Sequence, residues 1–274
     1  HPMTDVNAMS STEKIERGAT AVHQVGLQGA AIDALPAGAV PGTRAEAYSM
    51  QTRYAELEGQ PTLGWKIAAT SEAGQRHINV EGPLGGRVLA DRVQVDGEAV
   101  ALSGNSMCLA EPEFVFVLGT TLPPRPNPYT LDEVVAAVAA LHFGIELPSS
   151  RFTDVTTAGA LQMIADNACG HRFVLGPAAK ETWTSRDLAE VSMTAEVDGP
   201  AGPRTIEGVG RNVLGDPVAA LTWLVNELSA VDIGLAAGDF ITTGTCSEPI
   251  PVEPGDSLSA RFDDLGVVTC TFVD

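Results

Sequence analysis

The chain has 274 residues, 44% of them hydrophobic, and a formal net charge of −19 at pH 7. Its length is enough for a sizeable core in one large domain, or in one domain with a helical part attached. The negative charge argues against nucleic acid as a partner, because phosphates would be repelled, and no stretch is long and apolar enough to span a membrane.

The four cysteines are far apart in the sequence and form no CxxC pair. This spacing fits neither a zinc site nor a dense disulfide framework, so we expect reduced, mostly buried thiols in a cytoplasmic protein. The acidic surface mainly indicates solubility, and an anionic substrate would need a bound metal or a buried lysine to offset it.

Residues 1–62 are predicted to form an N-terminal helical portion. Residues 1–9 lack a signal-peptide pattern and are expected to be a tag or disordered. A first helix is predicted over about Ser10–Gly29, because Ser10 and Glu13 can form a capping box ahead of a helical apolar stripe. A second is predicted over Thr43–Glu58, ahead of a Gly/Pro break.

Residues 63–274 are predicted to form one catalytic β-roll domain. Strands are expected where β-forming residues gather between turn residues, at 63–70, 114–118, 142–148, 173–176, 191–197, near 205, 240–243, 257–262 and 267–272. Helices are expected at 130–141 and 216–230, and residues 78–91 are expected to form a long Gly/Pro-rich loop of a kind that is often functional. This order favours an α+β fold over a doubly wound sheet.

Glu111 and Glu113 stand at the start of the apolar strand that begins at Phe114. Side chains two apart on a strand share a face, so the two carboxylates repel each other and lose hydration. They need a cation, a shared proton or an open rim in water, and Mg²⁺ suits them because it binds carboxylate oxygens and keeps waters that a substrate can displace. The alternative is a solvated strand start, with Pro112 marking a sheet edge, and the short pattern alone favours it.

Two more charged residues lie inside predicted strands. Lys66 occupies an apolar segment, where a buried lysine is rare unless it is paired or functional; the alternative is a side chain whose amine reaches water. Glu146 is the one acid of the strand at 142–148, and its alternative interpretation is a structural ion pair with Arg151.

These charged residues belong to motifs that resemble the fumarylacetoacetate hydrolase superfamily, and most closely its 2-keto-4-pentenoate hydratase and 4-oxalocrotonate decarboxylase branch. The motifs are Gly64-Trp65-Lys66-Ile67, Glu111-Pro112-Glu113, and Ile145-Glu146 with Ser150-Arg151, followed by matches at 165–168, 173–176, 237–245 and 254–256. Each is weak alone, but their order and spacing are specific. The resemblance runs from about residue 11 to the C-terminus.

The resemblance implies a mixed β-sandwich-like roll surrounded by helices, an N-terminal helical portion and a homo-oligomer. It implies Mg²⁺ or Mn²⁺ held by Glu111, Glu113 and Glu146, with Lys66 beside a small anionic keto or enol acid. A metal that chelates a 2-keto acid stabilises its enolate. Lys66 could then transfer a proton with a lowered pKa, or stay charged and hold the substrate carboxylate.

The activity implied is that of a metal-dependent hydratase that adds water to a 2-hydroxy-2,4-dienoate and gives a 4-hydroxy-2-keto acid, as in aromatic meta-cleavage catabolism. The alternatives are a decarboxylase of a 4-oxalocrotonate-like keto acid and an acylpyruvate C–C hydrolase, which ranks lower because the N-terminal part has no clear His-Glu motif. A non-catalytic scaffold is a further alternative, against which the cluster of charges argues.

The chain departs from the branch in the segment after Ala165–Ala168, where Cys169 and Gly170 replace two serines and His171-Arg172 follow. Ser149 also occupies a position at which the proteins of this branch commonly have Asp, in an Asp-Ser-Arg triplet. His171, Glu248 and Lys66 are therefore the candidate catalytic residues, although His171 could be structural and Glu248 could face water. The candidate substrate contacts are Lys66, Cys169, Arg151 and, in the Gly/Pro-rich stretch, Leu84.

Overall fold

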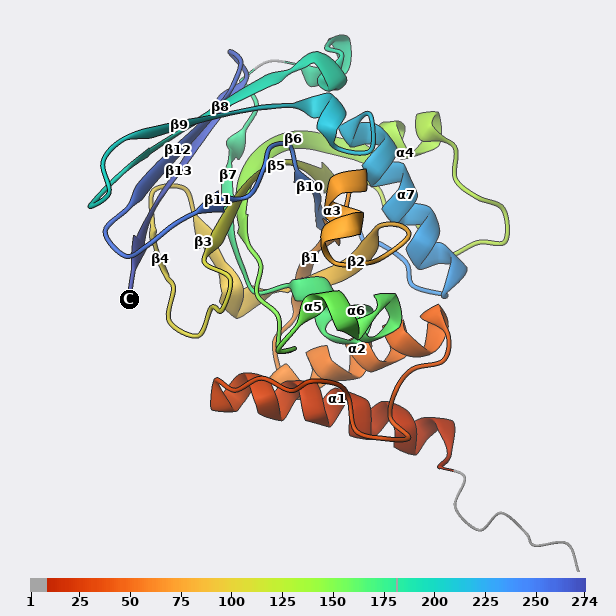
Figure 1. Cartoon of the computed structure of the whole chain (residues 1–274). Helices are drawn as coiled ribbons and strands as arrows, with labels where there is room; N and C mark the ends of the chain where they lie inside the picture. The colour runs from red at the N-terminus through yellow and green to blue at the C-terminus, as the bar shows by residue number, and fades with distance from the viewer. Residues whose placement is uncertain (1–8, 181) are drawn as a thin grey trace, which may run out of the picture.

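The computed structural model describes residues 9–180 and 182–274 (Figure 1). The segment expected to be a tag or disordered, residues 1–9, lies outside the described residues except for Met9. Within the described ranges, no helix has both the length and the apolar character needed to cross a bilayer.

Two N-terminal helices, α1 (Ser11–Gln28) and α2 (Arg44–Glu58), pack side by side. Ser10 caps α1 in a capping box with Glu13, and Gly59 ends α2 in a left-handed conformation with φ of 70°. Both predicted helices are confirmed, and β1 begins at Thr62, next to the predicted division of the chain.

An eight-stranded sheet curls through the centre of the molecule in the order β2-β1-β10-β5-β6-β7-β3, with β11 paired to β5 (Figure 1). Its strands are β1 (Thr62–Ala68), β2 (Leu84–Leu89), β3 (Val93–Val95), β5 (Leu109–Leu118), β6 (Val138–Leu147), β7 (Arg172–Ala178), β10 (Phe240–Thr245) and β11 (Ile250–Pro251). β1 and β10 pair in parallel although they are far apart in the sequence. The charged motifs found in separate segments therefore lie within four consecutive strands of one sheet, β1, β10, β5 and β6.

A second sheet of five strands runs in the order β4-β13-β12-β8-β9. Its strands are β4 (Ala99–Ala101), β8 (Ser192–Asp198), β9 (Arg204–Val209), β12 (Ser257–Phe262) and β13 (Gly266–Val273). Phe262 stacks on Phe143 of β6 at 4.3 Å between ring centroids and meets Phe114 of β5 edge-on at 5.1 Å. These buried aromatic contacts join the sheets, so the predicted α+β, sandwich-like roll is confirmed.

The remaining helices cover the central sheet and its connections. The α-helices are α3 (Glu72–His77), α4 (Leu131–Ala137), α5 (Val155–Ala158), α6 (Ala160–Ala165) and α7 (Pro217–Ala230); the 3₁₀ turns are η1 (Ala90–Arg92), η2 (Asn167–Cys169), η3 (Trp183–Ser185), η4 (Leu188–Glu190) and η5 (Gly210–Asn212). α7 begins as predicted, with Asp216 accepting a hydrogen bond from the Val218 N–H. α6 packs on α2, which joins the N-terminal helices to the sheet.

Two local predictions are wrong. Residues 78–91 are not a long loop, because β2 lies within them and pairs with β1. Gly86 lies opposite Lys66 in the pairing of β2 with β1, and a Cβ at this position would lie only 2.4 Å from the carbonyl oxygen of Asn167. Glycine is therefore needed here because the backbone of residue 167 approaches β2 closely, and not for flexibility. The helix predicted over 130–141 ends at Ala137, and residues from Val138 onward extend the strand that pairs with β5.

Candidate active site

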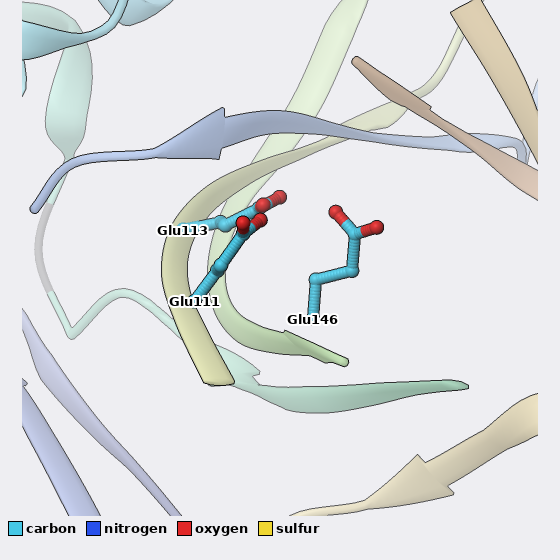
Figure 2. Close-up of side chains that lie close together, drawn as sticks. All are labelled: Glu111, Glu113 and Glu146. Carbon is cyan, nitrogen blue, oxygen red and sulfur yellow. The ribbon is translucent and has the colours of Figure 1, made fainter. Parts of the chain in front are cut away.

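Three acids converge from two adjacent strands of the central sheet. Glu111 and Glu113 project from one face of β5, and Glu146 lies directly opposite Glu111 on antiparallel β6. Figure 2 shows the three carboxyl groups pointing toward one another. One oxygen from each lies within 4.8 Å of the others, and Glu113 and Glu146 are 0% and 2% exposed.

The alternative of a solvated sheet edge is wrong. β5 lies between β10 and β6, and Pro112 is buried. Pro112 falls where β5 passes from its partner β11, at Leu109 and Ala110, to β10, whose pairing with β5 reaches Glu113. The proline therefore marks a change of partner strand inside the sheet.

The acids have more acceptor oxygens than the protein has donors for them. One oxygen of Glu113 accepts hydrogen bonds from the Thr242 hydroxyl and from the Gly244 N–H, the latter at 3.2 Å. The other oxygen of Glu113 and Oε2 of Glu146 are buried without a hydrogen bond in the described part of the chain, and Oε1 of Glu146 has only an ion pair with Lys66 at 2.8 Å. Buried acceptors are normally satisfied, so these oxygens fit ligands of a cation.

Electrostatics support the same interpretation. Burial, followed by the charge of Glu146, raises the pKa of Glu111 to about 8. Burial and the two neighbouring acids raise the pKa of Glu113 well above its usual range. A divalent cation would offset this repulsion, and three carboxylates form the hard oxygen set that suits Mg²⁺ or Mn²⁺.

Lys66 stands beside the acids, on β1. Its Nζ lies 2.8 Å from Oε1 of Glu146 and donates a hydrogen bond to the Ala168 carbonyl at 2.6 Å. Burial is the largest single effect and opposes the charged form, but Glu146 and the other acidic groups around it together outweigh burial and raise the pKa of Lys66. Lys66 is 2% exposed, so the alternative in which its amine reaches water is wrong. Of the two roles considered for Lys66, the structure favours a charged amine that holds the substrate carboxylate over an amine with a lowered pKa.

Residues 166–170, which we call the strap, cross over Lys66. Its Asn167, Ala168 and Cys169 all have left-handed backbone angles, with φ of 56°, 49° and 61°. Such conformations are costly for residues other than glycine and persist only where the surroundings impose them. The Asn167 side chain holds β2 by accepting from the Arg87 N–H at 2.6 Å and donating to the Arg87 carbonyl at 2.9 Å.

Arg151 anchors the strap from its other side. Its guanidinium pairs with the Asp166 carboxylate, and it also donates to the carbonyls of Asp166 and Gly170. The proposed pairing of Arg151 with Glu146 is therefore wrong. All three guanidinium nitrogens are bound to the strap, so the structure gives Arg151 a supporting position and not an open substrate contact.

The other candidate residues lie in different surroundings. Leu84 is 0% exposed in the main apolar core, and burial raises the pKa of the Cys169 thiol to about 12, so the thiol stays protonated. Glu248 is exposed in the connection from β10 to β11, two residues before Ile250, whose partner on β5 is Ala110. A role for Leu84 or Glu248 in the reaction stays a prediction.

A narrow pocket brings three of the predicted residues together. It is lined by Lys66, Arg87, Val88, Glu146, Gly170, His171, Arg172 and Phe173.

Four groups that support the site were not predicted from the sequence as site residues: Thr242, Gly244, Asp166 and the Ala168 carbonyl. Thr242 and Gly244 lie in the motif at 237–245, and Asp166 and Ala168 in the motif at 165–168, but nothing in either pattern says which charged residue each contacts.

Comparison with known proteins agrees with this geometry. Residues 86–273 match the family model described as fumarylacetoacetate (FAA) hydrolase C-terminal. The chain is 32% identical over 230 residues to a TodF product hydratase of Pseudomonas putida (82% of this chain, 83% of that protein), and 29% identical over 269 residues to a 2-keto-4-pentenoate hydratase of Burkholderia vietnamiensis (97% and 100%). The solved 4-oxalocrotonate decarboxylase from Pseudomonas putida G7, complexed with magnesium and adipate, has a TM-score of 0.84 and 27% identity, covering 97% of this chain and 100% of that one.

Proposed function

The chain belongs to the fumarylacetoacetate hydrolase family, and from that premise we propose that it is a metal-dependent hydratase. It adds water to a small 2-hydroxy-2,4-dienoate and gives a 4-hydroxy-2-oxo acid. The observation that carries the proposal is the group of buried acids with unsatisfied oxygens beside a charged Lys66. The relatives named as hydratases support the choice of reaction.

Glu111, Glu113 and Glu146 would hold Mg²⁺ or Mn²⁺. When bound, this ion supplies a Lewis acid for the carboxylate and 2-oxo oxygens of the substrate and stabilises negative charge there. Lys66 holds a proton at Nζ, and two of its three hydrogens are directed to Glu146 and to the strap. The third hydrogen is left to orient the substrate or to move a proton.

The atoms of the reaction balance without a redox partner. The dienol loses the proton of its 2-hydroxyl group, gains a proton at its far carbon, C5, and becomes a conjugated 2-oxo-3-enoate. Water then adds its oxygen at C4, and a proton arrives at C3. Burial of Lys66 and Glu146 keeps bulk water away from the end of the site at which the acid is held.

A decarboxylase of a 4-oxalocrotonate-like keto acid is the second candidate. The likeness to the decarboxylase complexed with magnesium and adipate favours it, because adipate is a dicarboxylate. Loss of CO₂ and addition of water both use negative charge stabilised on the 2-oxo group, so the metal site serves either reaction.

We further propose that the protein acts as a homo-oligomer. Light scattering after size-exclusion chromatography measures the mass in solution and tests this proposal.

The deciding experiment follows 2-hydroxypenta-2,4-dienoate with Mg²⁺ by NMR, with EDTA as a control. We expect 4-hydroxy-2-oxopentanoate to form, and EDTA or Glu113→Ala to stop it. Turnover that survives both would refute the metal-dependent proposal. CO₂ release from 2-oxohex-3-enedioate, without hydration of the dienoate, would replace the hydratase with the decarboxylase.

A further inference from the structure

His171 is a pocket residue to which the proposed reaction assigns no task. It follows the strap directly, stands just before β7, and lines the same pocket as Lys66 and Glu146. Its Nδ1 lies 3.0 Å from Nδ2 of Asn105, whereas its Nε2 makes no hydrogen bond to any described residue. The protonation of this ring decides what it can offer a ligand.

Asn105 fixes which ring nitrogen carries the proton. Its Oδ1 accepts hydrogen bonds from the backbone N–H groups of Met107 and Cys108, at 2.9 and 2.8 Å, which sets the orientation of the amide. Nδ2 therefore faces the other way and donates to the Pro148 carbonyl at 3.1 Å and toward His171. An amide nitrogen donates only, so Nδ1 of His171 must accept and the proton must be on Nε2.

The surroundings keep the ring neutral. Burial, followed by the positive charges of Arg92, Arg151 and Arg172, lowers the pKa of His171 to about 3. The one acid among the residues that line this pocket is Glu146, and its carboxylate is paired with Lys66. His171 therefore offers the same single N–H at every physiological pH.

The pocket thus presents fixed donors that match an anionic oxygen. Lys66 has one ammonium hydrogen beyond those directed to Glu146 and the strap, and Arg172 adds positive charge at the pocket lining. The Nε of Arg172 is buried without a hydrogen-bond partner in the described chain. Val88 and Phe173 give the pocket an apolar part, and Arg87, Gly170 and the Glu146 carboxylate, which is paired with Lys66, complete its lining.

We propose that His171 is a neutral, Nε2-protonated hydrogen-bond donor that, together with Lys66, holds an anionic oxygen of the substrate. This inference rests on the proposed function for the nature of the substrate, a 2-oxo or 2-enol acid. It assigns His171 to binding and orientation, with no proton given up during the reaction. Asn105 is then a positioning residue, which acts only through the tautomer of His171.

The tautomer is measured first, without any ligand. Long-range ¹⁵N–¹H correlation of the imidazole rings, assigned by loss of one set of signals in His171→Gln, should give an Nε2–H pattern for His171 that is unchanged from pH 5.5 to 8.5. In Asn105→Asp the carboxylate only accepts, so a proton should move to Nδ1. Titration of wild-type His171 near pH 6.5, or an Nδ1–H pattern, would overturn the proposal.

Binding is measured next with 2-oxopentanoate, a 2-oxo acid that lacks a 4-hydroxyl group to eliminate. In calorimetry with Mg²⁺, His171→Phe should weaken binding about tenfold, the value of one hydrogen bond to a charged group. His171→Gln, whose amide N–H can replace Nε2–H, should stay within about threefold, and exposed His77→Gln on α3 should match the wild type.

The outcomes separate the two proposals. Equal affinity of wild type and His171→Phe overturns the role of His171 and leaves the hydratase proposal standing. If wild-type protein with Mg²⁺ neither binds 2-oxopentanoate nor hydrates the dienoate, the proposed function fails, and this inference fails with it. Should His171→Phe not fold, the NMR pattern together with His171→Gln still decides.

Discussion

Glu111→Gln tests whether the acid cluster is a cation site, because it changes one charge with almost no change in shape. In EDTA-treated protein, burial and the charge of Glu146 raise the pKa of Glu111 from 4.5 to about 8. The folded state then holds this proton more tightly than the unfolded chain does. The contribution of Glu111 to stability is therefore fully present below pH 4.5 and is lost progressively as the pH rises toward 8.

The magnitude follows from the two pKa values. The difference between 4.5 and 8, at about 1.36 kcal/mol for each pH unit, corresponds to about 5 kcal/mol. Glu111 is partly exposed, so solvent screening reduces this, and we expect about 2 kcal/mol. Glutamine carries no charge at any pH, so cation-free Glu111→Gln should be more stable than cation-free wild type at pH 8 and nearly equal to it at pH 4.5.

Thermal unfolding followed by circular dichroism provides the assay. At pH 8 in EDTA, the variant should melt about 5 °C above the wild type, since about 1 kcal/mol shifts Tm by 2–4 °C in a chain of this size. With Mg²⁺ the order should reverse, because the variant keeps only two of the three carboxylates and gains less binding energy than the wild type. Glu72→Gln, at an exposed site, is the control. A variant that is less stable than the wild type in EDTA at pH 8 would refute the reasoning.

Three further predictions concern the lysine, the strap and β2. Lys66→Met removes the charge paired with a buried carboxylate, and we expect turnover of the dienoate to fall at least 100-fold; a fall below tenfold in steady-state kinetics would contradict it. Asp166→Asn leaves the guanidinium of Arg151 without its carboxylate and should cost about 3 kcal/mol in urea denaturation, whereas a cost below about 1 kcal/mol would mean that the pair does not anchor the strap. Gly86→Ala places a Cβ 2.4 Å from a strap carbonyl and should cost about 1–3 kcal/mol and lower kcat, while Gly82→Ala, with nothing within 4 Å, should leave both unchanged.

The acids of the site could be found from the sequence because their signal is local. Glu111 and Glu113 share a face through strand alternation, and Glu146 is the one acid in a largely apolar strand. A charged residue inside a buried strand is costly, so it stands out before any partner is known. Lys66 was recognisable for the same reason.

The partners of those residues could not be predicted, because they depend on non-local pairing. Lys66 contacts Glu146 only because the sheet and the strap bring together segments that are 80 residues apart in the sequence. Arg151 pairs with Asp166 and not with Glu146, because its guanidinium binds both ends of the strap, at Asp166 and Gly170. The start of β6 was missed for a related reason. The spacing of Val138 and Leu141 fits the apolar stripe of a helix as well as it fits a strand. These residues form a strand because they pair with β5.

The face of the sheet that carries the acids also bears on which residues determine the substrate. Beyond them the same face is apolar, where the rings of Phe173 and Phe240 stack at 5.3 Å and fill the spaces that Gly144 and Gly64 leave open. The acids fit both reactions found among the relatives, hydration and decarboxylation. The metal site therefore cannot separate the two reactions, and the groups that hold the rest of the substrate must do so. We propose that in this chain those groups lie at Gly170 of the strap and at His171, which line the pocket beside Lys66 in the segment where the sequence departs from the branch it resembles.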